Sequence, residues 1–97
     1  MTSQVSLKFR TFANEGILLL MGVPGQDFLS LELTDGRVRY QYNLGSGTRP
    51  IVSSQTFNDG KWHTVFASRL KQDGLLKVDG LTSEFSSIWI DLHRIDL

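Results

Sequence analysis

The segment from Asn58 to Val65 combines a turn signal with the opening of a β-strand, in that order. Its first part, Asn58-Asp59-Gly60, consists of residues that tolerate the backbone conformations of a tight turn. Its second part, Trp62-His63-Thr64-Val65, begins a β run. The chain contains four Asp-Gly pairs, which punctuate runs of alternating apolar and polar residues. This pattern predicts an antiparallel meander in which short turns join neighbouring strands.

The spacing of apolar residues predicts where the strands lie. Val5, Leu7 and Phe9 alternate with polar residues, which is typical of a strand with one buried face and one wet face. Residues 17–21 are apolar throughout, which suggests a strand buried on both faces. Asp73-Gly74 is expected to form a turn. We expect strands at 5–10, 17–21, 28–33, 38–43, 62–69 and 75–78, a short strand candidate at 51–54, and no helix longer than one or two turns.

Apolar residues of these strands are expected to form the core. The tail, residues 81–97, is harder to assign, because Ser83, Ser86 and Ser87 suggest a loop whereas residues 88–92 favour one more strand. The residues expected to be mostly buried are Phe9, Leu18, Leu20, Leu31, Leu33, Val38, Tyr40, Trp62, Val65 and Val78.

Composition limits the classes of function. The 97 residues suffice for one domain at most. Ten Lys and Arg residues balance ten Asp and Glu residues, so no overall field attracts nucleic acid or an acidic membrane. The absence of cysteine excludes disulfides, thiolate zinc sites and a catalytic cysteine. The longest apolar run, residues 17–21, is too short to span a bilayer. We expect no nucleic-acid partner and no membrane insertion.

Further motifs follow one another in a specific order along the chain. They are Phe9-Arg10-Thr11, Glu15-Gly16-Ile17-Leu18-Leu19-Leu20, Asp27-Phe28-Leu29, Asp35-Gly36, Asn43-Leu44-Gly45-Ser46-Gly47 and Val78-Asp79-Gly80. Together with the segment from Asn58 to Val65, they resemble the laminin G-like family over about residues 5–80, with a weaker extension to residue 97. The resemblance implies an all-β fold, an antiparallel β-sandwich or jelly roll (concanavalin-like), in an extracellular protein that is secreted or an ectodomain.

The resemblance also bears on domain organisation. Family domains are considerably longer, so residues 1–97 are expected to be a single laminin G-like domain fragment, incomplete at the C-terminus. Residues 1–4 are interpreted as a linker or an expression-derived addition, and residues 81–97 as an uncertain tail. An incomplete sandwich exposes strand edges, which invite self-association.

The hairpin around Asp35-Gly36 suggests a calcium site. Asp27 opens the first strand of this hairpin and Leu44 ends the second, so a turn near the midpoint brings both to one rim of the sandwich. The Asp27 carboxylate and the Leu44 carbonyl are the oxygen ligands that calcium prefers.

The resemblance implies the same two ligands and two more from a later segment. The best matches for these are the Arg94 carbonyl and the Asp96 side chain, with Asp91 as a competitor of Asp96. Four protein ligands leave positions for water, so the expected dissociation constant is roughly 10⁻⁴–10⁻³ M. A purely structural role for Asp27, as a turn-capping residue, stays open.

Two pairs of cations form a second candidate site. Arg37 and Arg39 share the wet face of one expected strand, and Lys8 and Arg10 share that of another, with Arg49 in a nearby loop. Such local clusters could bind acidic polysaccharides, although charged residues on a wet strand face are more often simply solvated.

Catalysis is not expected. There is no G-x-S-x-G motif, and Glu15, Glu32 and Glu84 show no paired spacing. His63 has no second imidazole nearby, since His93 lies thirty residues away, so a structural role is favoured for it. We interpret the chain as an extracellular recognition or adhesion module that binds a cell-surface glycan or a receptor, with a calcium-dependent site. The alternative is a metal-independent structural or protein–protein interaction module.

Overall fold

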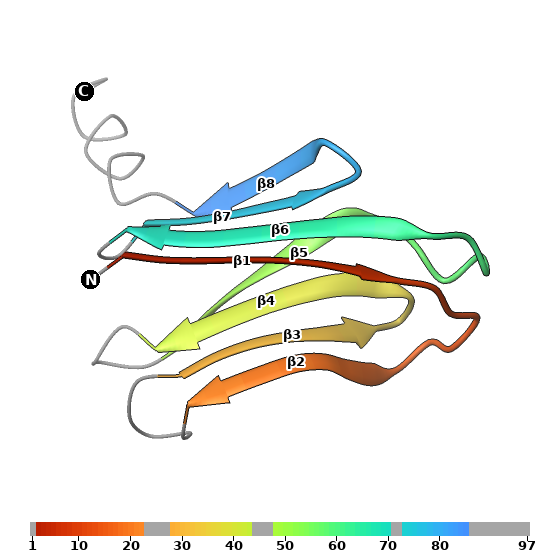
Figure 1. The fold of residues 1–97 in the computed structure, drawn as a ribbon, viewed down its shortest axis with the longest axis horizontal. Helices are drawn as coiled ribbons and strands as arrows, with labels where there is room; N and C mark the ends of the chain where they lie inside the picture. Colours follow the sequence, from red (N-terminus) through yellow and green to blue (C-terminus); the bar gives the residue numbers. More distant parts are fainter. Residues whose placement is uncertain (1, 23–27, 44–47, 71–72, 86–97) are drawn as a thin grey trace, which may run out of the picture.

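The computed structural model describes residues 2–22, 28–43, 48–70 and 73–85. Within these ranges the chain forms eight β-strands and no helix (Figure 1). All six predicted strands are confirmed, and the candidate at 51–54 is part of a longer strand. The strands are β1 (Thr2–Phe9), β2 (Gly16–Gly22), β3 (Phe28–Thr34), β4 (Arg37–Asn43), β5 (Thr48–Thr56), β6 (His63–Leu70), β7 (Asp73–Val78) and β8 (Leu81–Phe85).

The strand β8 corrects a prediction, because its serine had suggested a loop. It pairs with β7 along its whole length, from Val78 opposite Leu81 to Gly74 opposite Phe85. The tight turn at Asp79-Gly80 sets this register, and the ladder of backbone hydrogen bonds accepts a serine as readily as an apolar residue. The further strand candidate at 88–92 lies outside the described residues.

The strands form two four-stranded antiparallel sheets, in the orders β1-β6-β7-β8 and β2-β3-β4-β5. In Figure 1 the two sheets appear as layers, and β5 lies against β7 and β8 of the other sheet. The predicted fold class, an antiparallel β-sandwich of jelly-roll type, is therefore confirmed.

Two of the Asp-Gly pairs form the predicted hairpin turns. Asp35 and Gly36 have φ angles of 52° and 78°, and Asp79 and Gly80 have 51° and 84°. Two consecutive residues with positive φ make a type I′ turn, whose twist matches that of the flanking strands. The prediction of a turn at Asp73-Gly74 is wrong: both residues lie in β7, where the ring of Tyr42 covers Gly74 so closely that a Cβ atom would not fit.

The core lies between the sheets. Seven residues of the predicted core are confirmed as buried, and Leu18 is partly buried against them. The structure adds further residues from five of the strands and from the segment after β5. The buried apolar residues are Phe9, Leu29, Leu31, Leu33, Val38, Tyr40, Tyr42, Ile51, Phe57, Val65, Ala67, Leu76 and Val78.

Two predicted core residues are exposed instead. Trp62 is 64% exposed, because it precedes β6 and lies beyond the end of the sandwich. Leu20 is 52% exposed, and Ile17 and Met21 of the same strand are also exposed. The prediction that residues 17–21 are buried on both faces is therefore wrong. Among the described strands β2 is an edge strand that pairs only with β3, so much of its surface faces solvent.

The sandwich has two different ends. The turn rim, at the right of Figure 1, contains the turns at Asp35-Gly36 and Asp79-Gly80 and the segments 10–15 and 57–62. Backbone hydrogen bonds join these segments, from Gly60 N to Thr11 O at 2.9 Å and from Gly36 N to Asn14 O at 3.0 Å.

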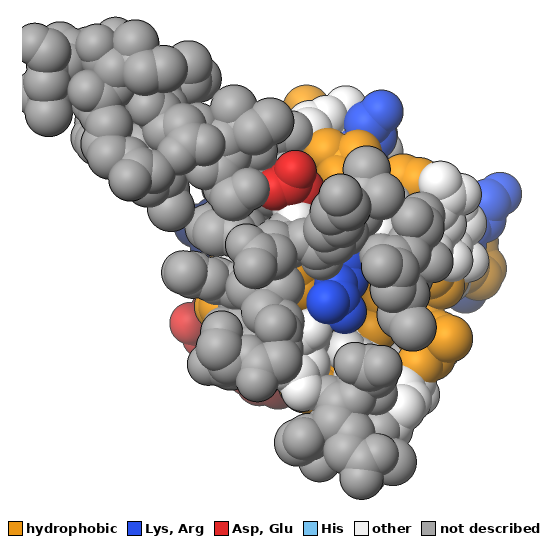
Figure 2. Space-filling view, turned by 90° about the vertical axis from the view of Figure 1, so that its left-hand side faces the viewer, with side chains coloured by type: hydrophobic (Ala, Val, Ile, Leu, Met, Phe, Trp, Pro, Cys, Tyr) orange, Lys and Arg blue, Asp and Glu red, His pale blue; other side chains and the backbone are white. Residues whose placement is uncertain are grey.

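The strand-end rim, at the left of Figure 1, is where β2 and β4 end and where β3 and β5 begin. Figure 2 views the molecule from this end and shows described side chains of apolar, basic and acidic kinds lying among one another. No single type of side chain therefore dominates the part of this rim that the structure describes.

Candidate functional site

The calcium site predicted from the sequence is expected at the strand-end rim. The β3–β4 hairpin is regular, with Leu29 opposite Tyr42 and Thr34 opposite Arg37. Its open end is therefore formed by Phe28 and Asn43, the first residue of β3 and the last of β4. The predicted ligands themselves, Asp27, Leu44, Arg94 and Asp96, lie outside the described residues. Their convergence stays a prediction.

The described ranges do not offer another metal site. Among residues 2–22, 28–43, 48–70 and 73–85, no group of three or more His, Cys, Asp and Glu side chains could hold a metal ion.

Arg37 and Arg39 lie on the outer face of β4, alternating with the buried Val38 and Tyr40. Arg37 Nη1 donates hydrogen bonds to backbone carbonyls of β5, those of Ser53 at 3.2 Å and Ser54 at 2.6 Å. These bonds hold the Arg37 guanidinium against the neighbouring strand.

Arg39 has a different partner. Its Nη1 lies 3.3 Å from Oε1 of Glu32 on β3, and both side chains are partly exposed. An ion pair this accessible to water contributes about 0–1 kcal/mol to stability. Binding of an acidic ligand by Arg37 and Arg39 stays a prediction.

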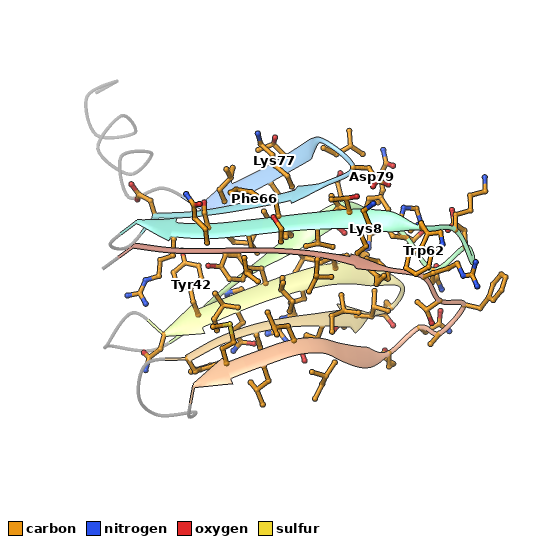
Figure 3. The ribbon with its side chains drawn as sticks, viewed as in Figure 1. Lys8, Tyr42, Trp62, Phe66, Lys77 and Asp79 are labelled. Carbon is orange, nitrogen blue, oxygen red and sulfur yellow. The ribbon has the colours of Figure 1, made fainter. Side chains whose placement is uncertain are left out.

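The other predicted basic pair is divided between two environments. Lys8 is exposed on β1, whereas Arg10 follows the end of that strand. The Arg10 guanidinium carbon lies 5.2 Å from the centre of the Trp62 ring, a cation–π arrangement. Figure 3 shows Trp62 and Asp79 at the turn rim and Tyr42 towards the opposite end of the sandwich.

The turn rim contains a cluster that the sequence did not reveal. His63 is only 7% exposed. Its Nδ1 lies 2.6 Å from Asp79 Oδ2, and its Nε2 lies 2.7 Å from Asp59 Oδ1. The rings of Phe9 and Phe57 pack against the imidazole, with centroid distances of 5.6 Å and 5.1 Å.

The structural role expected for His63 comes from these two carboxylates, which lie on opposite sides of the ring. The sequence prediction considered only a second imidazole as a partner of His63. The two carboxylates belong instead to two of the Asp-Gly pairs. Asp59 is four residues before His63, and Asp79 is sixteen residues after it. The available signal was that two of the four Asp-Gly pairs flank the strand that His63 begins.

This arrangement requires a protonated imidazole. A neutral imidazole has one N–H donor and one acceptor, whereas an ionised carboxylate only accepts hydrogen bonds. Since both ring nitrogens of His63 face carboxylate oxygens, both must carry a proton. Burial lowers the pKa of His63, but hydrogen bonds to Asp79 and Asp59 outweigh burial and raise this pKa above its ordinary value of 6.5.

The pKa values of the two carboxylates shift in the opposite direction. The hydrogen bond from His63 lowers the pKa of Asp79, and the backbone N–H of Thr64 adds to this effect. The hydrogen bond from His63 also lowers the pKa of Asp59, with a further contribution from the backbone N–H of Lys61. All three shifts therefore favour the state in which a protonated imidazole lies between two ionised carboxylates.

The two antiparallel sheets, each with an Asp-Gly hairpin at the turn rim, define a β-sandwich of the class used for interaction modules. The chain belongs to the laminin G domain family, because the model of the Laminin G domain matches residues 9–91. The predicted family is therefore confirmed.

Several known proteins are similar to this chain. Human pikachurin is 46% identical over 81 residues, covering 79% of this chain and 8% of that protein. The mouse basement membrane-specific heparan sulfate proteoglycan core protein is 41% identical over 81 residues, covering 78% of this chain and 2% of that protein. The structure of domains LG4-5 of the mouse laminin alpha1 chain superposes with a TM-score of 0.79 at 33% identity, covering 88% of this chain and 23% of that chain.

The comparisons define the general class of function. The chain spans less than a tenth of the length of these curated relatives. Laminin G domains are non-enzymatic adhesion modules, so this chain is an interaction module of the extracellular matrix type and not an enzyme. The matrix relatives indicate an extracellular location. No helix that could cross a bilayer occurs in the described part of the chain.

Proposed function

We propose that this chain, as part of a secreted protein or an ectodomain, recognises a cell-surface or matrix glycan or receptor through a calcium-bearing strand-end rim. The observation that carries the proposal is the register of the β3–β4 hairpin, in which Leu29 lies opposite Tyr42. Each step outward along an antiparallel ladder keeps partners opposite one another. A ladder continued by two steps would set Asp27 opposite Leu44.

The proposed ligands have the chemistry that calcium requires. The Asp27 and Asp96 carboxylates and the Leu44 and Arg94 carbonyls would supply hard oxygen atoms. Bound calcium would supply positive charge and open coordination positions for a carboxylate or sulfate of the ligand. A ligand that extends from this rim along the outer face of β4 would reach Arg39 and then Arg37, which lie four and six residues before Asn43, the rim residue of that strand. Their hydrogen bonds to Ser53, Ser54 and Glu32 support an auxiliary role, because they keep the cationic groups in place.

Calcium titration followed by NMR and calorimetry tests this proposal. We expect millimolar calcium to shift the amide signals of Phe28 and Asn43 in the unmodified chain, and to shift neither in Asp27→Ala. Asp35→Asn is the matched control, since it removes one carboxylate at the opposite rim and Asn tolerates the positive φ of that turn. Asp91→Ala and Asp96→Ala decide which carboxylate of the tail contributes. Absence of any shift at several millimolar calcium would contradict the proposal.

The metal-independent alternative, a structural or protein–protein interaction module, is favoured by a different observation. Several large apolar side chains are exposed on the described surface, among them Phe12, Ile17, Leu20 and Trp62. Exposed apolar side chains that lie together mark surfaces that contact other proteins. Receptor binding that is unchanged by a calcium chelator, and weakened by Phe12→Ala or Leu20→Ala, would favour this alternative.

A further inference from the structure

We infer that Asp59, His63 and Asp79 form a proton-dependent clamp at the turn rim, and that deprotonation of His63 releases the carboxylate of Asp59 while the β7–β8 turn stays in place. This inference is independent of the proposed calcium site, which belongs to the opposite end of the sandwich. It rests on the geometry of the three side chains and on the unequal ways in which the two carboxylates are anchored.

The clamp joins three parts of the chain. His63 is the first residue of β6, Asp79 begins the turn between β7 and β8, and Asp59 lies in the segment between β5 and β6. The only charged groups that face the imidazole among the described residues are these two carboxylates. Phe9 at the end of β1 and Phe57 after β5 provide the apolar walls around it.

Asp79 is anchored independently of the imidazole. Its backbone N–H donates to the Thr64 carbonyl at 2.9 Å, and its Oδ1 accepts the Thr64 N–H at 2.9 Å. These two bonds fix the β7–β8 turn to β6 whatever the protonation state of His63. Asp79 Oδ2 therefore remains beside Nδ1, and the last ring proton is retained on that nitrogen.

Asp59 is held less firmly. Its carboxylate is about half exposed, and apart from His63 its partners are nearby backbone N–H groups, that of Lys61 at 3.0 Å and that of Asp59 itself. When His63 loses a proton, Nε2 presents a lone pair to Asp59 Oδ1 across 2.7 Å. Two acceptors at that distance repel each other. The carboxylate of Asp59 must then move away, and the residues bonded to it follow.

The neighbouring exposed surface depends on this segment. The ring of Phe12 lies directly over Gly60, leaving no room for a Cβ atom there. Arg10 stacks on Trp62, the residue next to His63. We call the surface formed by Arg10, Phe12, Gly60 and Trp62 the aromatic rim. Protonated His63 keeps the Asp59 carboxylate in place, and it acts together with the hydrogen bond from Gly60 N to Thr11 O in holding the aromatic rim.

An NMR pH titration of the 97-residue chain tests the clamp, with signals followed from about pH 5 to about pH 10, a range that spans histidine titration. We expect the ring of His63 to titrate above the ordinary histidine pKa of 6.5. The backbone amide signals of Gly60, Lys61 and Trp62 should shift with the midpoint of His63. The amide proton of Thr64 should stay protected from exchange with solvent throughout, because its bond to Asp79 persists.

Variants separate the clamp from a merely structural contact. Asp59→Asn should lower the His63 midpoint and abolish the titration-linked shifts of Gly60 and Trp62 while the chain stays folded, since Asp59 is on the surface. Asp35→Asn, at another turn of the same rim, should change neither. Two results would overturn the inference. One is a pH midpoint for the amide shifts of residues 59–62 that differs from the midpoint of the His63 ring. The other is persistence of these shifts, unchanged, in Asp59→Asn.

Discussion

The imidazole of His63 and the carboxylate of Asp79 lie 2.6 Å apart, although sixteen residues separate them in the sequence. The contact exists because β6 and β7 are neighbours in one sheet and the β7–β8 turn returns to the start of β6. It places a charged pair at the edge of the core, where the rings of Phe9 and Phe57 limit access of water.

Stability should depend on pH in a way set by this cluster. The pKa of His63 is raised on folding, so its contribution is fully present below its ordinary value of 6.5 and is lost as pH rises through the folded value. The pKa values of Asp59 and Asp79 are lowered, so their contributions are present above the ordinary value of 3.8 and are lost as pH falls through the folded values. Urea unfolding should therefore show greatest stability between these two ordinary values. In His63→Gln the alkaline loss should disappear.

The contact between Tyr42 and Gly74 should make Gly74 intolerant of a side chain. A Cβ atom at Gly74 would overlap the phenol ring and hydroxyl of Tyr42, which is fully buried. We expect Gly74→Ala to lower the free energy of unfolding by about 1–3 kcal/mol, as overpacking does. Gly16→Ala is the control, since nothing lies within 4 Å of a Cβ atom there. Denaturant midpoints that fall equally in both variants would contradict this explanation.

Leu31 and Leu20 should respond very differently to truncation. Leu31 is completely buried, so Leu31→Ala should lower the free energy of unfolding by about 2–5 kcal/mol. Leu20 is exposed on β2, so Leu20→Ala should change the free energy of unfolding by about 0.5 kcal/mol or less. Chemical denaturation measures both. A large loss in Leu20→Ala would show that its side chain is covered in solution.

The β2 edge should promote self-association. The seven residues of β2, Gly16–Gly22, include no charge and no proline. The other edge strands of the described sheets each contain a charged residue or a proline, which discourages pairing. Met21→Lys should therefore reduce the concentration-dependent association seen in sedimentation experiments. Ser6→Lys on the edge strand β1 is the control, and an equal reduction there would argue against β2 as the contact.

The strands and two of the turns could be predicted from the sequence because both depend on neighbours in the chain. Alternation of apolar and polar residues along β1 and β3 selects one buried face without reference to any partner. Asp35-Gly36 and Asp79-Gly80 adopt positive φ because of their own residue types. The register of the β3–β4 hairpin, on which the proposed calcium site depends, follows from the first of these turns.

The sequence by itself determined the pattern of strands, the type I′ hairpins and the family. Only the tertiary structure decided that Trp62 is exposed, that Leu20 lies on an open edge and that His63 is enclosed by two carboxylates. The reason is that burial and charge pairing depend on which distant segments meet. Trp62 has the composition of a core residue, but it lies beyond the end of the sandwich and stacks on Arg10. The pKa of His63 is raised because folding brings Asp59 and Asp79 to opposite sides of one ring.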